Sequence, residues 1–83
     1  MRKLTLMKNL KTKFDLETDT TESFGIGEGG IWIRDNIANE KTEFYNYADG
    51  TMVENNILNK FLFQNGWFAE PYDNETIMLY PIN

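Results

Sequence analysis

With 83 residues and a hydrophobic fraction of 41%, the chain is long enough for one folded domain with a modest core and too apolar for a disordered segment. It contains no cysteine and no histidine, which excludes disulfides, thiol catalysis and sites that depend on imidazole. No stretch approaches the roughly 18 apolar residues of a membrane span, and no secretory h-region is present. We therefore expect a single cytoplasmic domain over residues 1–83.

The charge is unevenly distributed along the chain. The first thirteen positions hold five of the eight basic residues and no acid, whereas the other seventy hold all thirteen acids and a formal net charge of −10. Such an acidic body repels phosphates, so we expect no direct binding of nucleic acid. It would attract a basic groove on another protein, although charge of this size also serves solubility.

The first elements follow from apolar spacing. Leu6, Leu10 and Phe14 recur at helical intervals, which predicts a helix over residues 4–14, with an extended start as the alternative. Residues 13–19 then alternate between apolar and acidic side chains, which predicts a half-buried strand with an acidic outer face.

Two further strands are expected over residues 31–35 and 42–47, because both segments are rich in β-branched and aromatic residues. The polar residues between them are few enough for a hairpin. Near the C-terminus, residues 76–80 are predicted to form a last strand, which Pro81 ends.

A second helix is expected over residues 51–65. Thr51 and Glu54 have the spacing of a capping box, and an apolar stripe follows them. Gly66 is expected in the left-handed conformation that ends many helices, with Trp67 packed against the last turn.

The predicted order is α-β-β-β-α-β. This order indicates an α+β fold, in which a small antiparallel sheet of three to four strands is packed by a C-terminal-half helix and a short N-terminal helix.

Motifs for catalysis, cofactors or metals are weak in this sequence. The segment Gly25–Gly30 has dinucleotide-loop spacing, but a strand pattern rather than a helix follows it, so a turn or bulge is the simpler interpretation. Asp15, Glu17 and Asp19 have the spacing of a calcium loop, without its glycine and final glutamate. Thirteen acids make some carboxylate pair inevitable, so we nominate no catalytic, cofactor or metal residue and expect no enzyme.

Acidic loops and aromatic side chains remain as candidates for partner binding. Aromatic residues are dense, and Trp32, Tyr45 and Tyr47 are candidate anchors of a protein interface. Acidic and amide groups cluster between the second and third strands and again after the second helix, where they have the chemistry to engage the arginines of a nucleic-acid groove. With one further acid near the N-terminus, the candidate partner-binding residues are Asp15, Asp35, Asn39, Glu40, Glu70, Asp73 and Glu75.

Over about residues 1–70 the arrangement resembles a small acidic type II-A anti-CRISPR protein of phage or prophage origin. The matching stretches are the strand Ile31 to Asn36, the hairpin pair Asn39-Glu40, and the helix Ile57 to Trp67 that ends in Asn65-Gly66-Trp67. The resemblance implies inhibition by mimicry, in which an acidic surface occupies the positive groove of a guide-RNA nuclease. It implies roles for Asn39, Glu40, Glu70 and Asp73, and a weaker one for Asp15.

Two functions are therefore expected, and the oligomeric state is left open. The first is a phage-type anti-defence inhibitor that binds a nucleic-acid-handling enzyme, such as a CRISPR nuclease, through a DNA-mimicking surface. The alternative is a small non-enzymatic adaptor or assembly protein that uses an aromatic sheet face. A small ligand-binding domain or enzyme built on the glycine segment is a third interpretation.

Overall fold

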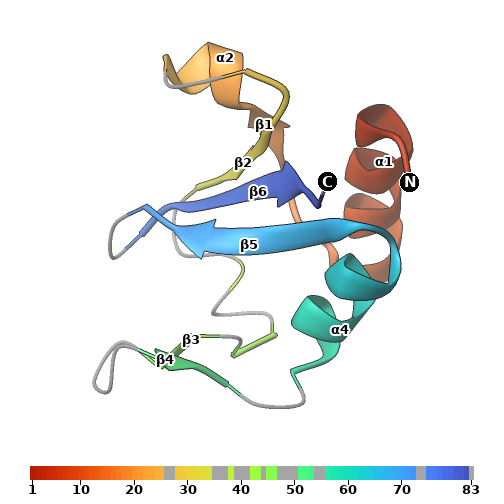
Figure 1. Cartoon of the computed structure of the whole chain (residues 1–83), viewed down its shortest axis with the longest axis vertical. Helices are drawn as coiled ribbons and strands as arrows, with labels where there is room; N and C mark the ends of the chain where they lie inside the picture. Colours follow the sequence, from red (N-terminus) through yellow and green to blue (C-terminus); the bar gives the residue numbers. More distant parts are fainter. Residues whose placement is uncertain are drawn as a thin grey trace.

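The computed structural model describes residues 1–25, 28–34, 38, 42–43, 45–46, 51–53, 56–72 and 75–82. The elements in chain order are α1 (Lys3–Phe14), β1 (Asp19–Thr20), α2 (Thr21–Phe24), β2 (Ile31–Ile33), β3 (Tyr45–Asn46), β4 (Thr51–Met52), α4 (Ile57–Gln64), β5 (Trp67–Pro71) and β6 (Ile77–Pro81) (Figure 1).

Four strands form one antiparallel sheet in the order β1-β2-β6-β5, and β3 and β4 form a separate two-stranded ladder. The last strand, β6, lies between β2 and β5, so the four-stranded sheet is complete only when this C-terminal strand is in place. Helices with a small antiparallel sheet confirm the predicted α+β fold.

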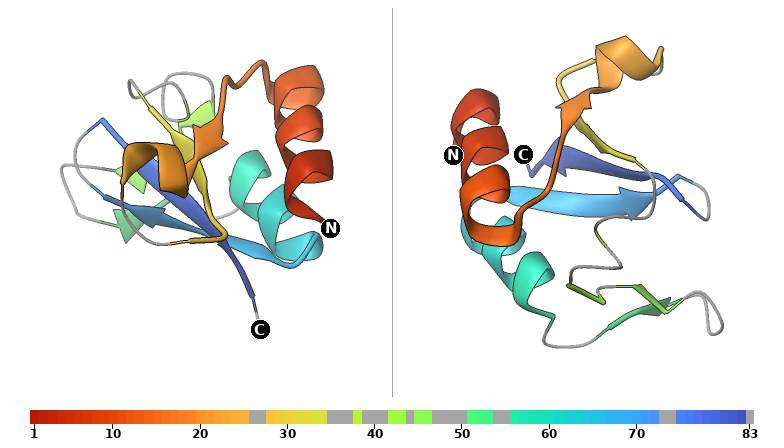
Figure 2. Two further views of the ribbon diagram at one scale, coloured as in Figure 1. Left: turned by 90° about the horizontal axis from the view of Figure 1, so that it is seen from above. Right: turned by 180° about the vertical axis from the view of Figure 1, so that it is seen from behind.

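The core lies between one face of this sheet and the helices α1 and α4. Ile31, Leu79 and Ala69 pair across β2, β6 and β5, and the first two are fully buried. Leucines from both helices complete the same cluster: Leu6, Leu10, Leu58 and Leu62. Figure 2 shows that α1 and α4 lie on the same side of the sheet, which leaves its opposite face uncovered by either helix.

The predicted N-terminal helix is confirmed, but the strand predicted over residues 13–19 is wrong over most of its length. Phe14 is the last residue of α1, and Asp15 adopts the left-handed conformation with φ 57°. Leu16 is then buried, and its N–H donates to the carbonyl of Leu10 at 3.1 Å. The apolar residues Phe14 and Leu16 are therefore the last residue of a helix and a core residue just after it, not two positions on one strand face. Strand pairing begins only at Asp19.

The predicted hairpin between residues 31–35 and 42–47 is also wrong. Both edges of β2 are occupied, by β1 and by β6, and β3 pairs with β4. Thr42 is helical rather than extended, and its hydroxyl donates to the carbonyl of Ala38 at 2.6 Å. Among the described residues, three elements were not predicted, namely α2, β4 and β5, whereas the last predicted strand is confirmed as β6.

The second predicted helix ends as expected but begins later. Gly66 has φ +81°, and its N–H donates to the carbonyl of Phe63 at 3.2 Å. The capping box is wrong, because Thr51 belongs to β4 and pairs with Asn46. Asn56 is the N-cap instead: its side-chain oxygen accepts from the N–H groups of Leu58 and Asn59, and its amide donates to the carbonyl of Thr42.

Replacing Asn56 with alanine is expected to lower the free energy of unfolding by about 1–2 kcal/mol, because the change removes a helix cap and a bond to a distant segment. The side chain is only 7% exposed, so water replaces its contacts poorly. Urea denaturation monitored by circular dichroism measures the loss. Thr51→Ala is the matched control. An equal or larger loss of unfolding free energy in that variant would mean that Thr51, as in the predicted capping box, is the N-cap after all.

Candidate functional site

The face of the sheet that points away from α1 and α4 carries aromatic side chains. Trp32, Met78 and Glu70 lie opposite one another across β2, β6 and β5, and Tyr80 pairs with Phe68 in a second row. Because side chains alternate along a strand, all five share this side of the sheet. We call these five residues the aromatic face.

Exposure varies from residue to residue on the aromatic face. Met78 is buried, whereas Phe68 is 43% exposed. The ring centroids of Phe68 and Tyr80 lie 6.0 Å apart with 40° between the ring planes, which is the geometry of a tilted aromatic pair. The face therefore combines a buried centre, Met78, with an aromatic pair in which Phe68 is exposed and Tyr80 is half-buried.

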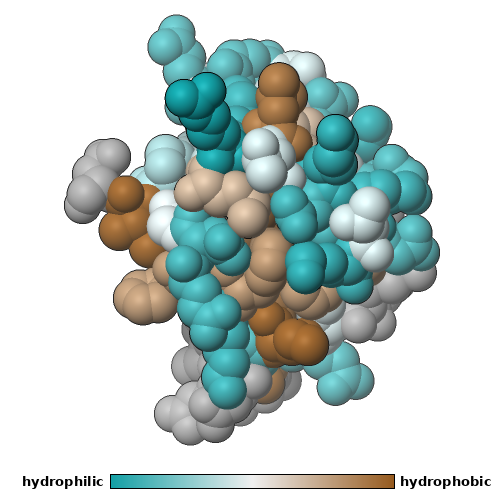
Figure 3. All heavy atoms as spheres, turned by 90° about the vertical axis from the view of Figure 1, so that its right-hand side faces the viewer, coloured by the Kyte–Doolittle hydropathy of each residue, from teal (hydrophilic) through white to brown (hydrophobic). Residues whose placement is uncertain are grey.

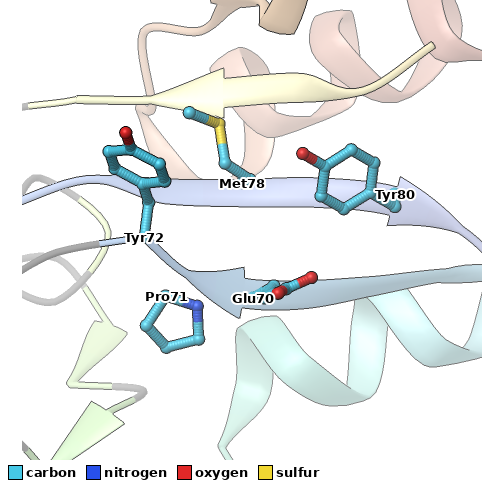
Figure 4. Close-up of a pocket in the computed structure, with 5 residues that line it drawn as sticks. All are labelled: Glu70, Pro71, Tyr72, Met78 and Tyr80. Carbon is cyan, nitrogen blue, oxygen red and sulfur yellow. The ribbon is translucent and has the colours of Figure 1, made fainter. Parts of the chain in front are cut away.

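A pocket of about 260 Å³ opens beside this aromatic pair, and we call it the Glu70 pocket (Figure 4). Tyr72 and Tyr80 lie on either side of Met78, and the carboxylate of Glu70 extends from the neighbouring strand. The N–H of Tyr72 donates to the carbonyl of Thr76 at 2.9 Å, which closes the hairpin that holds these side chains. The described residues that line the pocket are Glu70, Pro71, Tyr72, Met78 and Tyr80.

A guanidinium group already lies on the same side of the sheet. Arg34, two residues beyond Trp32, places its guanidinium carbon 4.8 Å from the centre of the Trp32 ring. Its other contact is Asp19 on β1, at 3.8 Å between nitrogen and carboxylate oxygen. This group shows the chemistry that the face favours, which is a cation between an aromatic ring and a carboxylate.

The predicted partner-binding acids separate into two places. Glu70 and Glu75 are both exposed and lie in the β5–β6 hairpin. Asp15 caps the end of α1, and Lys11 contacts it at 3.3 Å. The remaining predicted residues lie outside the described part of the chain: Asp35, Asn39, Glu40 and Asp73.

Several acids of the N-terminal half are paired with cations. Lys11 contacts Glu17 as well as Asp15, and hydrogen bonds to Glu17 and then Asp15 raise the pKa of Lys11. The pKa of Glu22 is lowered by its own backbone N–H and by that of Gly29, with Lys3 at 3.6 Å as a further contact. These pairs are exposed and add little stability, but they reduce the negative charge that a partner would meet there.

Glu70 differs from those acids. It forms no ion pair with any residue in the described ranges, and it opens onto the pocket between the tyrosines. Its carboxylate is therefore placed to receive a cation from outside the chain.

The glycine segment does not form a phosphate site in the residues described. Gly25 caps α2 with φ +95°, and the strand β2 rather than a helix follows Gly30. No helix N-terminus is thus available to hold a phosphate. Among the described residues no three acids gather closely enough to hold a metal ion, and no helix there is long and apolar enough to cross a membrane.

A second hollow of about 440 Å³ lies between α1 and α4. The rings of Phe14 and Phe61 meet edge to face at 5.4 Å, and the ammonium group of Lys13 lies 5.7 Å from the centre of the Phe61 ring. Phe63, also on α4, is 73% exposed. Figure 3 shows this side of the molecule, where hydrophilic side chains surround scattered apolar ones.

The sequence did not indicate which aromatic residues lie beside Glu70 on the sheet. Of the predicted interface aromatics, Trp32 lies on the aromatic face, whereas Tyr47 and the side chain of Tyr45 lie outside the description. Phe68 and Tyr80 were not selected, because their pairing depends on β5, which was not predicted. Side-chain burial alternates along β5, but the residue types of Trp67–Pro71 do not, so the sequence contains no period-two signal for this strand.

Comparison of the chain with protein-family models, with curated proteins and with solved structures gave no significant match. The resemblance to anti-CRISPR proteins therefore stays a prediction.

Proposed function

We propose that this chain is a protein-binding module that docks its partner on the aromatic face of the sheet. The observation that carries the proposal is the exposed ring of Phe68, packed against the half-buried ring of Tyr80, on a face that neither α1 nor α4 covers. Aromatic residues with a charged rim are typical of the centres of protein interfaces, where they supply large contact area at low entropic cost. This proposal develops the adaptor alternative.

The test is a comparison of Phe68→Lys with wild type and with the matched control Phe63→Lys, which changes an exposed phenylalanine on α4. Each protein is immobilised, bacterial lysate is passed over it, and a captured protein is purified for direct binding measurements. We expect Phe68→Lys to weaken binding about thirtyfold and Phe63→Lys to leave it unchanged. Loss in Phe63→Lys with full binding by Phe68→Lys would move the docking site to the helices and overturn the proposal.

A second candidate is the anti-defence inhibitor, and the β5–β6 hairpin is the observation that favours it. Glu70 and Glu75 both lie in the β5–β6 hairpin, and Asp73, which the resemblance also implicates, falls between them in the sequence. In this proposal the hairpin enters the basic groove of a nucleic-acid-handling enzyme, such as a CRISPR nuclease, in the bacterial cytoplasm.

For that candidate, the affinity for the purified enzyme should fall steeply with salt, and double-stranded DNA should compete with the protein. The double variant Glu70→Lys with Glu75→Lys should weaken binding, whereas Glu17→Lys should not. Binding that ignores both salt and these charge reversals would contradict mimicry while leaving the aromatic docking face untouched.

A further inference from the structure

We infer that the Glu70 pocket binds a single arginine side chain, presented by a basic segment of the partner protein. The inference rests on the proposed docking function and names the chemistry of the partner. It also assigns a role to a pocket that the sequence motifs did not indicate.

The size and lining of the pocket favour one side chain. Its volume of about 260 Å³ lies below the roughly 300–1,000 Å³ of typical small-molecule sites. In the described part of the chain, the carboxylate of Glu70 and the rings of Tyr72 and Tyr80 line it. A carboxylate repels phosphates and attracts cations, and tyrosine rings attract cations as well.

Arginine fits this lining better than lysine does. A guanidinium is planar, stacks on aromatic rings and donates two parallel hydrogen bonds to one carboxylate, whereas an ammonium is a compact and strongly hydrated charge. The chain itself provides an example on the same face, where Arg34 stacks on Trp32 and contacts Asp19. The pocket offers the same two kinds of group to an arginine from another molecule.

Charge complementarity identifies the partner segment as basic. Among the described residues, no basic side chain lines the Glu70 pocket, and Glu75 lies in the same hairpin. The chain beyond its first thirteen residues carries a formal net charge of −10. An arginine within a basic segment would thus be attracted both by the carboxylate in the pocket and by the negative potential of the surrounding acidic chain.

The experiment is an NMR titration of the full chain with three capped tripeptides, Gly-Arg-Gly, Gly-Lys-Gly and Gly-citrulline-Gly. Citrulline matches the shape of arginine without its charge. We expect the arginine peptide to bind with a Kd on the order of 1 mM, with shifts confined to β5, β6 and the two tyrosines. Glu70→Gln should weaken this binding about fivefold, and Glu17→Gln should not change it.

Three outcomes would overturn the inference: equal binding of the lysine and arginine peptides, shifts centred elsewhere, or unchanged binding to a Glu70→Gln variant. A thermal melt of Glu70→Gln checks that the variant is folded, and this is expected because Glu70 is exposed. If the arginine peptide does not bind while Phe68→Lys still weakens partner binding as expected, the arginine pocket is wrong and docking on the aromatic face stands. If Phe68→Lys has no effect, the docking function itself fails.

Discussion

Replacing Trp67 with alanine is expected to lower the free energy of unfolding by about 3–5 kcal/mol, the usual cost of deleting a large buried aromatic side chain. Trp67 is 3% exposed, begins β5 and belongs to the core cluster. Its indole N–H also donates to the carbonyl of Met1 at 2.7 Å, which ties the start of the chain to the sheet. Because small domains are stable by only about 5–15 kcal/mol, the loss is a large share of the total.

Urea denaturation monitored by fluorescence and circular dichroism measures this effect. The control is Phe68→Ala, the adjacent residue on the opposite side of the same strand, which is 43% exposed. We expect that control to lose less than about 1 kcal/mol. Trp67→Phe separates packing from the hydrogen bond, and equal stabilities of Trp67→Ala and Phe68→Ala would contradict the core assignment.

Replacing Gly30 with valine is expected to destabilise the fold by about 1–3 kcal/mol through overpacking. A Cβ atom at this position would lie 2.7 Å from a methyl carbon of Thr21, 2.7 Å from a ring carbon of Tyr80 and 2.9 Å from the carbonyl oxygen of Leu79. The last of these atoms is backbone in the central strand, so a rotamer change cannot relieve the contact.

Gly30 is also held from the side of α2. Its N–H donates to the hydroxyl of Thr21 at 3.1 Å, and its carbonyl accepts from the Thr21 N–H at 3.2 Å. A side chain at Gly30 would therefore disturb both the hydrogen bonds to Thr21 at the start of α2 and the Tyr80 ring of the aromatic face. Thermal melts of Gly30→Val and of the exposed control Glu28→Val measure the effect, and equal melting temperatures would refute the close packing.

The candidate site shows how far sequence reasoning reached. Acidity predicted that Glu70 and Glu75 contribute to binding, and the structure places both in one hairpin. It did not predict that Asp15 would lie at the end of a helix beside Lys11. The aromatic partners of Glu70 were out of reach, because Tyr80 and Phe68 meet only through the pairing of β5 with β6.

The sequence by itself determined the features that depend on near neighbours. The helical spacing of Leu6 and Leu10 predicted α1, the β-branched run predicted β2, and Gly66 predicted the end of α4. Each of these features depends on residues a few positions apart in the chain, so a local sequence pattern is enough to predict it.

Only the tertiary structure decided which strands pair and where α4 begins. Threonine and asparagine are both common N-cap residues, so Thr51 and Asn56 are both possible caps by residue type. Asn56 is the cap because Thr51 pairs with β3 in a strand ladder and because the carbonyl of Thr42 accepts a hydrogen bond from the Asn56 amide. Likewise β2 pairs with β6 across most of the chain rather than with the segment that follows it. Such contacts depend on burial and hydrogen bonding between distant segments, which local spacing does not record.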